Sequence, residues 1–241
     1  KLGGHPVHFS PEEVGLGKRE PVADVAQVMS RMSDVAVIRT FAQETIEEFA
    51  ANASIPVINA LTDLEHPCQA LADTQTITEQ LGNVKGAKVA FIGDGNNVAV
   101  SLGYAVAGLG GHLTVASPDG YKLPAEDLEG ANTYGASAGG SVTQVTSPQE
   151  AVAGADIVYT DVWTSMGQET ETAKRLVAFD GYQVNPALLD QAGPNVKFMH
   201  DLPAHPGEEI SDGLLYDSRA VAFDQAENRL WAQAALMEKL I

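Results

Sequence analysis

The sequence lacks the residues that mark several protein classes. Among 241 residues there is one cysteine, Cys68, which excludes a disulfide within the chain and a cysteine-rich metal site. No run of about 18 apolar residues occurs, so no transmembrane helix is expected. Both absences favour a cytoplasmic protein without a membrane partner.

Basic residues are also scarce. The chain has 14 lysines and arginines against 32 acidic residues, which gives a formal charge of −18. Nucleic acids and anionic membranes need clustered positive charge, so neither is expected as a partner. Hydrophobic residues make up 44% of the chain, enough for a globular core. At about 150 residues per domain, this length corresponds to roughly one and a half domains.

The hydrophobic pattern alternates between short strand-like runs and longer helical ones. It predicts strands at residues 35–38, 55–58, 88–92, 113–116, 142–146, 157–160 and 196–199, the first two buried. It predicts helices at residues 43–51, 68–81, 98–109, 126–135, 148–153, 186–191 and 224–240. This alternation indicates an α/β fold with two doubly wound parallel-sheet units, joined by the helix that ends near Leu81.

Two segments carry polar groups at predicted helix starts. In His66-Pro67-Cys68-Gln69, the free amides of the first turn favour an anion, and His66 and Gln69 can add donors. The alternative is a capped helix with a polar histidine. The turn at residues 93–97 fails as a dinucleotide fingerprint because Val98 replaces its third glycine. An asparagine amide there can hold a carboxylate, or the turn serves packing alone.

Other polar residues follow predicted strands, where open α/β sheets bind ligands. Asp161 can pair with an ammonium group, and Ser165 and the Met166 amide can add hydrogen bonds; the alternative is an ordinary loop. Arg39 ends a strand that the apolar pattern predicts to be buried, and it therefore needs an anionic partner. Arg229, in the last helix, is one of six arginines; its alternative role is a surface ion pair.

The order of these motifs resembles the aspartate/ornithine carbamoyltransferase family, and its ornithine branch in particular. The matching blocks are His-Pro-Cys-Gln at 66–69, Gly-Asp-Gly-Asn-Asn at 93–97, Ser-Met-Gly at 165–167 and Glu-Asn-Arg at 227–229. The resemblance covers essentially the whole chain. Ser-Met-Gly is its most specific block, because it separates the ornithine enzymes from their aspartate and putrescine relatives.

The resemblance implies transfer of a carbamoyl group from carbamoyl phosphate to the δ-amine of L-ornithine, with no metal or organic cofactor. In that case Arg39, His66, Gln69, Arg229 and the Leu202 carbonyl hold carbamoyl phosphate. The family also implies a homotrimer and a role in arginine biosynthesis or catabolism. Positioning and electrostatic stabilisation would supply most of the catalysis.

The same resemblance assigns the ornithine end of the site. Asn97 and the Met166 amide would bind the α-carboxylate, while Asp161 and Ser165 would bind the α-amino group. The δ-nitrogen would then lie near Asp201, which completes a catalytic set with His66 and Arg39.

Asp201 is a departure from the family, whose catalytic-loop motif is His-Cys-Leu-Pro. A carboxylate is ionised at neutral pH without special tuning, unlike a thiol, and accepts a hydrogen bond from an ammonium group. We therefore expect Asp201 to orient the δ-amine and accept its charge or proton. Cys68, at a helix start, is not expected to be catalytic.

A second departure is the family's Ser-Thr-Arg-Thr phosphate motif, which lies upstream of the first residue here. The expectation is an N-terminally truncated sequence with little or no activity by itself. Its domains would be a partial carbamoyl-phosphate domain at 1–82, an ornithine domain at 83–222 and a returning helix at 223–241. The alternatives are a binding protein that has lost catalysis and a carbamoyltransferase for another amino acid.

Overall fold

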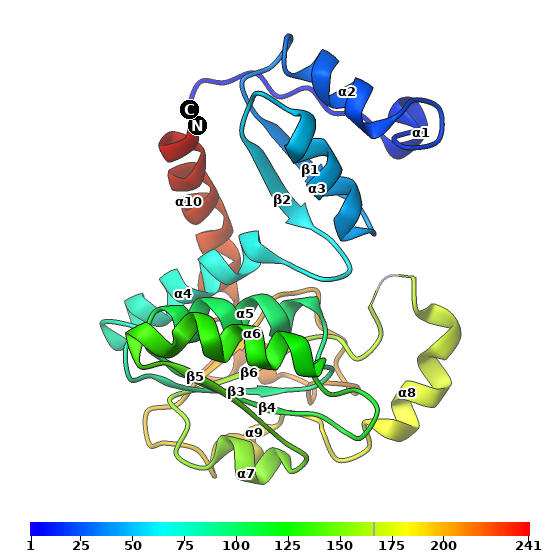
Figure 1. Cartoon of the computed structure of the whole chain (residues 1–241). Helices are drawn as coiled ribbons and strands as arrows, with labels where there is room; N and C mark the ends of the chain where they lie inside the picture. The colour runs from blue at the N-terminus through cyan, green and yellow to red at the C-terminus, as the bar shows by residue number, and fades with distance from the viewer. Residues whose placement is uncertain (166) are drawn as a thin grey trace.

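Two parallel sheets organise the protein, which confirms the expected α/β class (Figure 1). The computed structural model describes residues 1–165 and 167–241. The smaller sheet pairs β1 (Ala36–Arg39) with β2 (Val57–Leu61). The larger has the order β5-β4-β3-β6-β7 and consists of β3 (Lys88–Ile92), β4 (His112–Ala116), β5 (Ser141–Val145), β6 (Ile157–Thr160) and β7 (Lys197–His200).

The helices that the sequence predicts all form, with bounds shifted by one or two residues. They are α3 (Gln43–Asn52), α4 (Pro67–Leu81), α5 (Asn97–Gly108), α6 (Ala125–Gly135), α7 (Pro148–Val152), α9 (Pro186–Leu189) and α10 (Ala222–Leu240). The pattern missed α1 (Pro11–Val14), α2 (Val22–Met29) and α8 (Thr172–Ala178). Periodicity could not reveal α8, because its apolar residues Leu176 and Val177 are 40% and 78% exposed.

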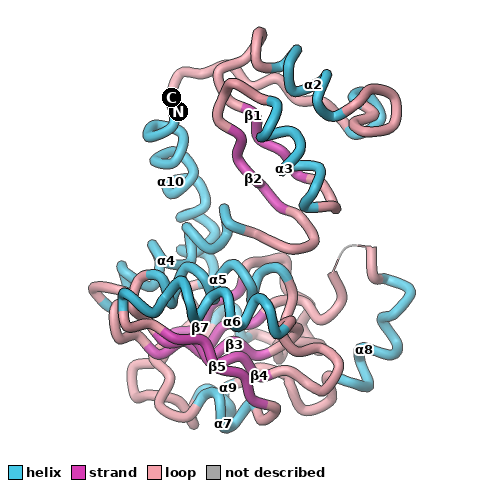
Figure 2. The backbone as a smooth tube through the Cα atoms, viewed as in Figure 1, coloured by secondary structure: helices cyan, strands magenta, loops and turns pink. Residues whose placement is uncertain are grey.

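The hydrophobic core lies on both faces of the five-stranded sheet. Figure 2 shows α4, α5 and α6 over one face and α7 and α9 under the other. Neighbouring strand residues point to opposite faces, so Phe91 joins the first layer and Ile92 the second. Phe91 stacks on Tyr159, with ring centroids 5.5 Å apart. This burial on both faces explains why β3 and β6 read as continuous apolar runs.

The smaller sheet corrects two expectations. Its strands are not fully buried, since Val37 is 51% exposed and Arg39 is exposed as well. Arg39 therefore does not close a buried strand. The second strand begins at Val57 rather than residue 55, because Pro56 has no amide hydrogen to donate to a ladder and offers only its carbonyl to Ala36.

Helix α10 brings the end of the chain back onto α4, and the two helices pack along each other. The chain termini consequently lie side by side (Figure 1), and the Lys1 ammonium sits 4.2 Å from the centre of the Trp231 ring. Leu71, expected as an apolar core position of α4, is 41% exposed and borders a surface cavity instead.

The order of the larger sheet reverses between β3 and β6, whose chain neighbours lie on opposite sides. In open parallel sheets, ligands bind beyond the carboxyl ends of strands at such a reversal. The loops after β3, β6 and β7 meet at this edge.

Candidate active site

The start of α4 presents a buried histidine. Pro67 occupies the first helical turn, where its missing amide costs no hydrogen bond, and His66 precedes it as the N-cap. The His66 amide donates to the Ser101 hydroxyl at 2.8 Å, and the residue is only 6% exposed. Burial, followed by the charges of Arg229 and Arg39, lowers the pKa of His66 to about 4. The ring is therefore neutral at physiological pH and keeps one N–H to donate.

We expect His66 to titrate well below an ordinary histidine. Nitrogen-15 NMR of the free protein, assigned with a His66→Gln variant, measures this midpoint. Because the folded pKa lies below the unfolded value near 6.5, this group's contribution to folding stability is present above pH 6.5 and falls toward pH 4. A midpoint close to 6.5 would contradict the buried, cation-flanked position of the ring.

Gln69 and Arg229 meet across the packed helices α4 and α10. The Arg229 guanidinium donates to Gln69 Oε1 at 2.5 Å, and Gln69 Nε2 donates to Asp73 Oδ1 at 2.8 Å. Gln69 is 1% exposed. Arg39 reaches the same region from the end of β1, since its charge contributes to the lowered pKa of His66. Two of the side chains predicted to hold carbamoyl phosphate, Gln69 and Arg229, are thus in direct contact, and the charges of Arg39 and Arg229 both act on His66.

Two carboxyl groups lie at neighbouring strand ends. Ile92 pairs with Thr160, and Thr160 pairs with His200, so β3, β6 and β7 end at the same level. Asp161 and Asp201 follow the last two strands directly. Asp161 accepts the amide of Val162 at 2.6 Å and is 6% exposed.

The loop after β3 supplies two asparagines with different partners. Asn96 accepts the amides of Val98 and Ala99 as the N-cap of α5, and its Nδ2 donates to Asp161 at 2.7 Å. Asn97, the predicted ornithine ligand, donates to the Thr62 carbonyl at 2.7 Å. Asn96 is therefore a site residue that the sequence reasoning missed. An asparagine after Gly-Asp-Gly at a helix start is a recognisable N-cap signal.

Asp201 has an unusual electrostatic environment. Burial, and after it the neighbouring Asp161, raise the pKa of Asp201 well above its usual range, while Arg229 opposes the shift. This corrects the expectation that Asp201 ionises without special tuning: two carboxyls so close together cannot both carry charge cheaply.

His200 does not neutralise Asp201. Its Nδ1 lies 3.7 Å from Asp201 but already accepts the Leu202 amide at 2.9 Å. In the neutral ring the proton is then on Nε2, which donates to Glu209 at 3.1 Å. Leu202 has φ 54°, a left-handed conformation that L side chains rarely adopt outside functional loops.

The loop after Asp161 is held by aromatic and ionic contacts. Trp163 is buried and stacks on Phe179 with ring centroids 5.5 Å apart, and its carbonyl accepts Arg175 at 2.9 Å. The Ser165 amide donates to Gln168 at 3.2 Å. Met166, predicted to bind the ornithine carboxylate, lies outside the described residues.

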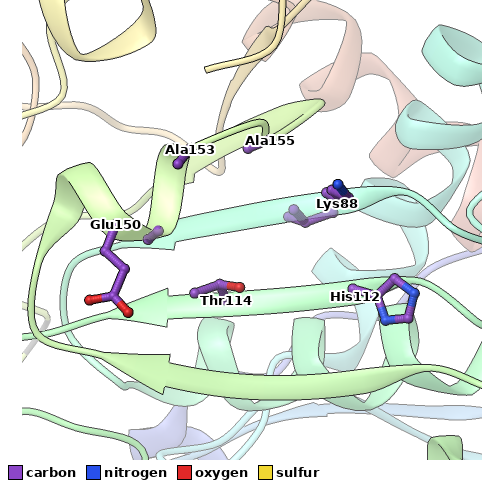
Figure 3. A pocket seen from close by; sticks show the side chains of 8 residues that line it. Lys88, His112, Thr114, Glu150, Ala153 and Ala155 are labelled. Atoms are coloured by element: carbon purple, nitrogen blue, oxygen red, sulfur yellow. The ribbon is translucent and has the colours of Figure 1, made fainter. Parts of the chain in front are cut away.

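A separate pocket of about 230 Å³ lies away from this site (Figure 3). Lys88 and His112, which begin β3 and β4, line it together with Glu150 of α7. The pocket thus includes the amino ends of parallel strands rather than the carboxyl ends where ligands bind. We assign no catalytic role to it.

Comparisons with known proteins match two family models to separate parts of the chain. The carbamoyl-P binding domain of aspartate/ornithine carbamoyltransferase matches residues 1–79, and the Asp/Orn binding domain of that family matches residues 85–240. The anabolic ornithine carbamoyltransferase of Pseudomonas aeruginosa is 54% identical over 241 residues, which is all of this chain and 77% of that protein. The ornithine carbamoyltransferase of Bacillus subtilis is 49% identical, over all of this chain and 76% of its own length.

Solved structures agree with these matches. The ornithine carbamoyltransferase from Pyrococcus furiosus superposes with a TM-score of 0.95 at 45% identity, covering 100% of this chain and 76% of that one. The ornithine carbamoyltransferase from Thermus thermophilus superposes with a TM-score of 0.87 at 43% identity, covering 100% of this chain and 78% of that one. Among the described helices, none is long and apolar enough to span a membrane. By sequence and by structure, the chain belongs to the aspartate/ornithine carbamoyltransferase family.

Proposed function

We propose that the full-length protein that carries these residues catalyses the ornithine carbamoyltransferase reaction. The δ-nitrogen of ornithine attacks the carbonyl carbon of carbamoyl phosphate, and a new C–N bond forms. The C–O bond to phosphate breaks, one proton leaves the nitrogen, and citrulline and phosphate are released. Relatives about half identical to this chain are named for this activity, and the Pseudomonas aeruginosa relative is named as anabolic. We assign the chain to arginine biosynthesis on that basis.

Carbamoyl phosphate would bind at the start of α4. The neutral ring of His66 would donate toward the carbonyl oxygen, where negative charge develops in the transition state. Gln69 would hold the carbamoyl amide, and the Leu202 carbonyl would face the same group. Arg39 and Arg229 would supply the positive charge that the phosphate needs in a chain of net charge −18.

Ornithine would bind beyond β6 and β7. Asp161 and Ser165 would receive the α-ammonium group, and Asn97 and the Met166 amide the α-carboxylate. An extended ornithine held in this way would place its δ-nitrogen at Asp201. The carboxyl would then accept the proton that attack on the carbonyl releases.

One observation carries the proposal: three buried polar atoms on residues predicted to bind the substrates have no hydrogen-bond partner among the described residues. They are His66 Nδ1, Arg229 Nε and Asp201 Oδ1. Their elements meet here, since the charge of Arg229 acts on the pKa of both His66 and Asp201. Buried polar atoms are almost always satisfied, so such a set indicates groups reserved for a ligand. A neutral imidazole, a guanidinium and a carboxyl suit a carbonyl, a phosphate and an amine, respectively.

The test compares three amines as carbamoyl acceptors. We expect citrulline formation from ornithine, and a kcat/KM at least about 100-fold lower for putrescine and N-acetylornithine. Putrescine lacks the α-carboxylate proposed to bind Asn97 and the Met166 amide, and the acetylated α-nitrogen of N-acetylornithine carries no charge for Asp161 to pair with. An Asp161→Asn variant should narrow the difference between ornithine and N-acetylornithine. Equal rates with ornithine and putrescine would contradict the proposed substrate.

A second candidate is a relative that binds both ligands without turnover. The observation favouring it is the carboxyl at residue 201, whose raised pKa favours the protonated form where the reaction needs an acceptor. Calorimetry with carbamoyl phosphate and norvaline, followed by the citrulline assay, separates the two functions. Binding without citrulline supports the second candidate.

The assembly and domain boundaries are also proposals. We infer a homotrimer in the cytoplasm, with a carbamoyl-phosphate domain at 1–82, an ornithine domain at 83–222 and a returning helix at 223–241. The packing of α10 on α4 supports the last assignment. Light scattering of the purified protein tests the trimer.

A further inference from the structure

A fully buried carboxyl in the second turn of α4 has a position that the reaction scheme does not use. Asp73 is 0% exposed and accepts three hydrogen bonds from three different elements. Gln69 on its own helix and Gln225 on α10 both donate to Oδ1, at 2.8 and 2.7 Å. The Tyr159 hydroxyl on β6 donates to Oδ2 at 3.2 Å. Asp73 therefore ties α4, α10 and the central sheet together.

The side-chain amides of Gln69 and Gln225, which both donate to Asp73, also accept hydrogen bonds from residues at the site. Gln69 Oε1 accepts Arg229, and Gln225 Oε1 accepts the backbone amide of His200 at 2.9 Å. An amide has one donor end and one acceptor end, and the Asp73 oxygen takes the donor end of each. The acceptor ends must then face Arg229 and His200. One oxygen atom thus fixes the direction of two amides that reach the site.

A second polar cluster joins the same two helices, and it offers a comparison for the hydrogen bonds of Asp73. Asn228 on α10 donates to the Thr76 hydroxyl at 3.0 Å and to Glu79 at 2.7 Å. Thr76 lies less than one turn beyond Asp73 and is also 0% exposed. Among the residues that the structure describes, its cluster joins α4 to α10 without a bond to any predicted site residue. A substitution in the Thr76 cluster therefore tests helix packing, and a substitution of Asp73 tests packing together with the position of the site residues.

We propose that Asp73 is a positioning residue: its Oδ1 orients Gln69 against carbamoyl phosphate and, through Gln225, the start of the loop that carries Asp201. The proposal rests on the proposed function, because it concerns the alignment of the two substrates of that reaction. A misplacement of about 1 Å between reacting groups costs roughly 100-fold in rate. Asp73 touches neither substrate and acts only through other residues.

The acceptor oxygen carries this role, not the charge. Burial raises the pKa of Asp73 to about 7, against the three donors and Arg229. The carboxyl is therefore present in both forms near neutral pH, and a proton on Oδ2 leaves Oδ1 as an acceptor. The Tyr159 hydroxyl can then turn and accept instead of donating. Asparagine reproduces this neutral form with its Oδ1 and NH₂ groups.

The experiment compares substitutions in the full-length protein that carries these residues. Asp73→Ala should lower kcat about 10- to 100-fold and raise KM for carbamoyl phosphate, because Gln69 loses its orientation. Asp73→Asn should keep kcat within about threefold of wild type, since it retains the acceptor. Thr76→Val, the matched control, should lower Tm and leave kcat within about twofold.

A variant of Gln225 separates the hydrogen-bond path through Gln225 from the path through Gln69. It also keeps the test informative if the Asp73→Ala protein misfolds. Gln225→Leu should lower kcat but leave KM for carbamoyl phosphate unchanged, because Gln69 keeps its contacts with Asp73 and Arg229. The proposal is overturned if Asp73→Asn loses as much activity as Asp73→Ala, or if Gln225→Leu changes kcat no more than Thr76→Val does. Wild-type protein that makes no citrulline would instead refute the proposed function.

Discussion

An Asp201→Asn variant is expected to lose about two to three orders of magnitude in kcat, the usual contribution of a positioned proton acceptor. Asparagine has the same shape as aspartate, so the loop after β7 should keep its fold. The amide cannot accept the proton that leaves the δ-nitrogen. KM for carbamoyl phosphate should change little, because the start of α4 is untouched. Citrulline formation at saturating concentrations of both substrates gives kcat directly.

The pH profile adds a second measurement for Asp201. Burial and the Asp161 carboxyl raise its pKa well above the usual range, so the protonated form of Asp201, which cannot accept a proton, persists to higher pH than for an ordinary carboxyl. Activity of the wild type should rise with pH through that pKa, and the Asn variant should lose this dependence. The α-ammonium group of bound ornithine favours ionisation of Asp201, which shifts the rise to lower pH for kcat than for kcat/KM.

Two controls isolate the effect. Asp212→Asn removes an exposed carboxyl from the segment after Glu209 and should leave kcat unchanged. Asp201→Cys introduces the residue that the family motif carries and should retain more activity than Asp201→Asn. If Asp201→Asn turns over at the wild-type rate, Asp201 is not the proton acceptor.

Removal of Arg229 should have the second large effect. An Arg229→Gln variant takes away the donor to Gln69 Oε1 and one of two cations near His66. We expect kcat/KM for carbamoyl phosphate to fall about 1,000-fold, since a buried charge-assisted contact to phosphate and the alignment of Gln69 are lost together. The pKa of His66 should rise above about 4, because the charge of Arg229 helps to depress it.

Steady-state kinetics and NMR titration of His66 measure these two consequences separately. Arg219→Gln is the matched control: Arg219 binds Asp217 at 2.9 Å and Asp190 at 2.6 Å, and none of the three belongs to the proposed site. It should lower stability and leave kinetics unchanged. A small kinetic effect of Arg229→Gln, with His66 still titrating near 4, would show that α10 contributes only to packing.

The sequence predicted the larger sheet well because its strands are buried on both faces. β3 and β6 were predicted with their observed bounds, since continuous apolar runs such as residues 88–92 have clear ends. The smaller sheet was predicted less well. A pair of strands with one exposed side gives a similar apolar pattern, so burial at Val37 and Arg39 was overestimated. Their exposure depends on what packs over the sheet, and a local pattern does not contain that information.

The candidate site shows the same limit. Residue type and position, at a helix start for His66 and after a predicted strand for Asp161, were enough to single out these two residues, and the family resemblance added Asp201. The partners that orient them come from distant parts of the chain: Gln225 lies 152 positions from Asp73. Helical spacing placed Asp73 on the same face as Gln69, four residues away, and was the available signal. The raised pKa of Asp201 followed from contacts that no local pattern encodes.

The loop Gly-Asp-Gly-Asn-Asn places two identical side chains next to each other with partners on separate halves of the molecule. Asn96 binds Asp161 beside the larger sheet, and Asn97 binds Thr62 in the segment that leaves the smaller one. The two asparagines have the same composition and the same helix propensity, yet each has its own hydrogen-bond partner. An insertion or deletion in this stretch would therefore disrupt the site, because a shift of one position would move both amides away from Asp161 and Thr62.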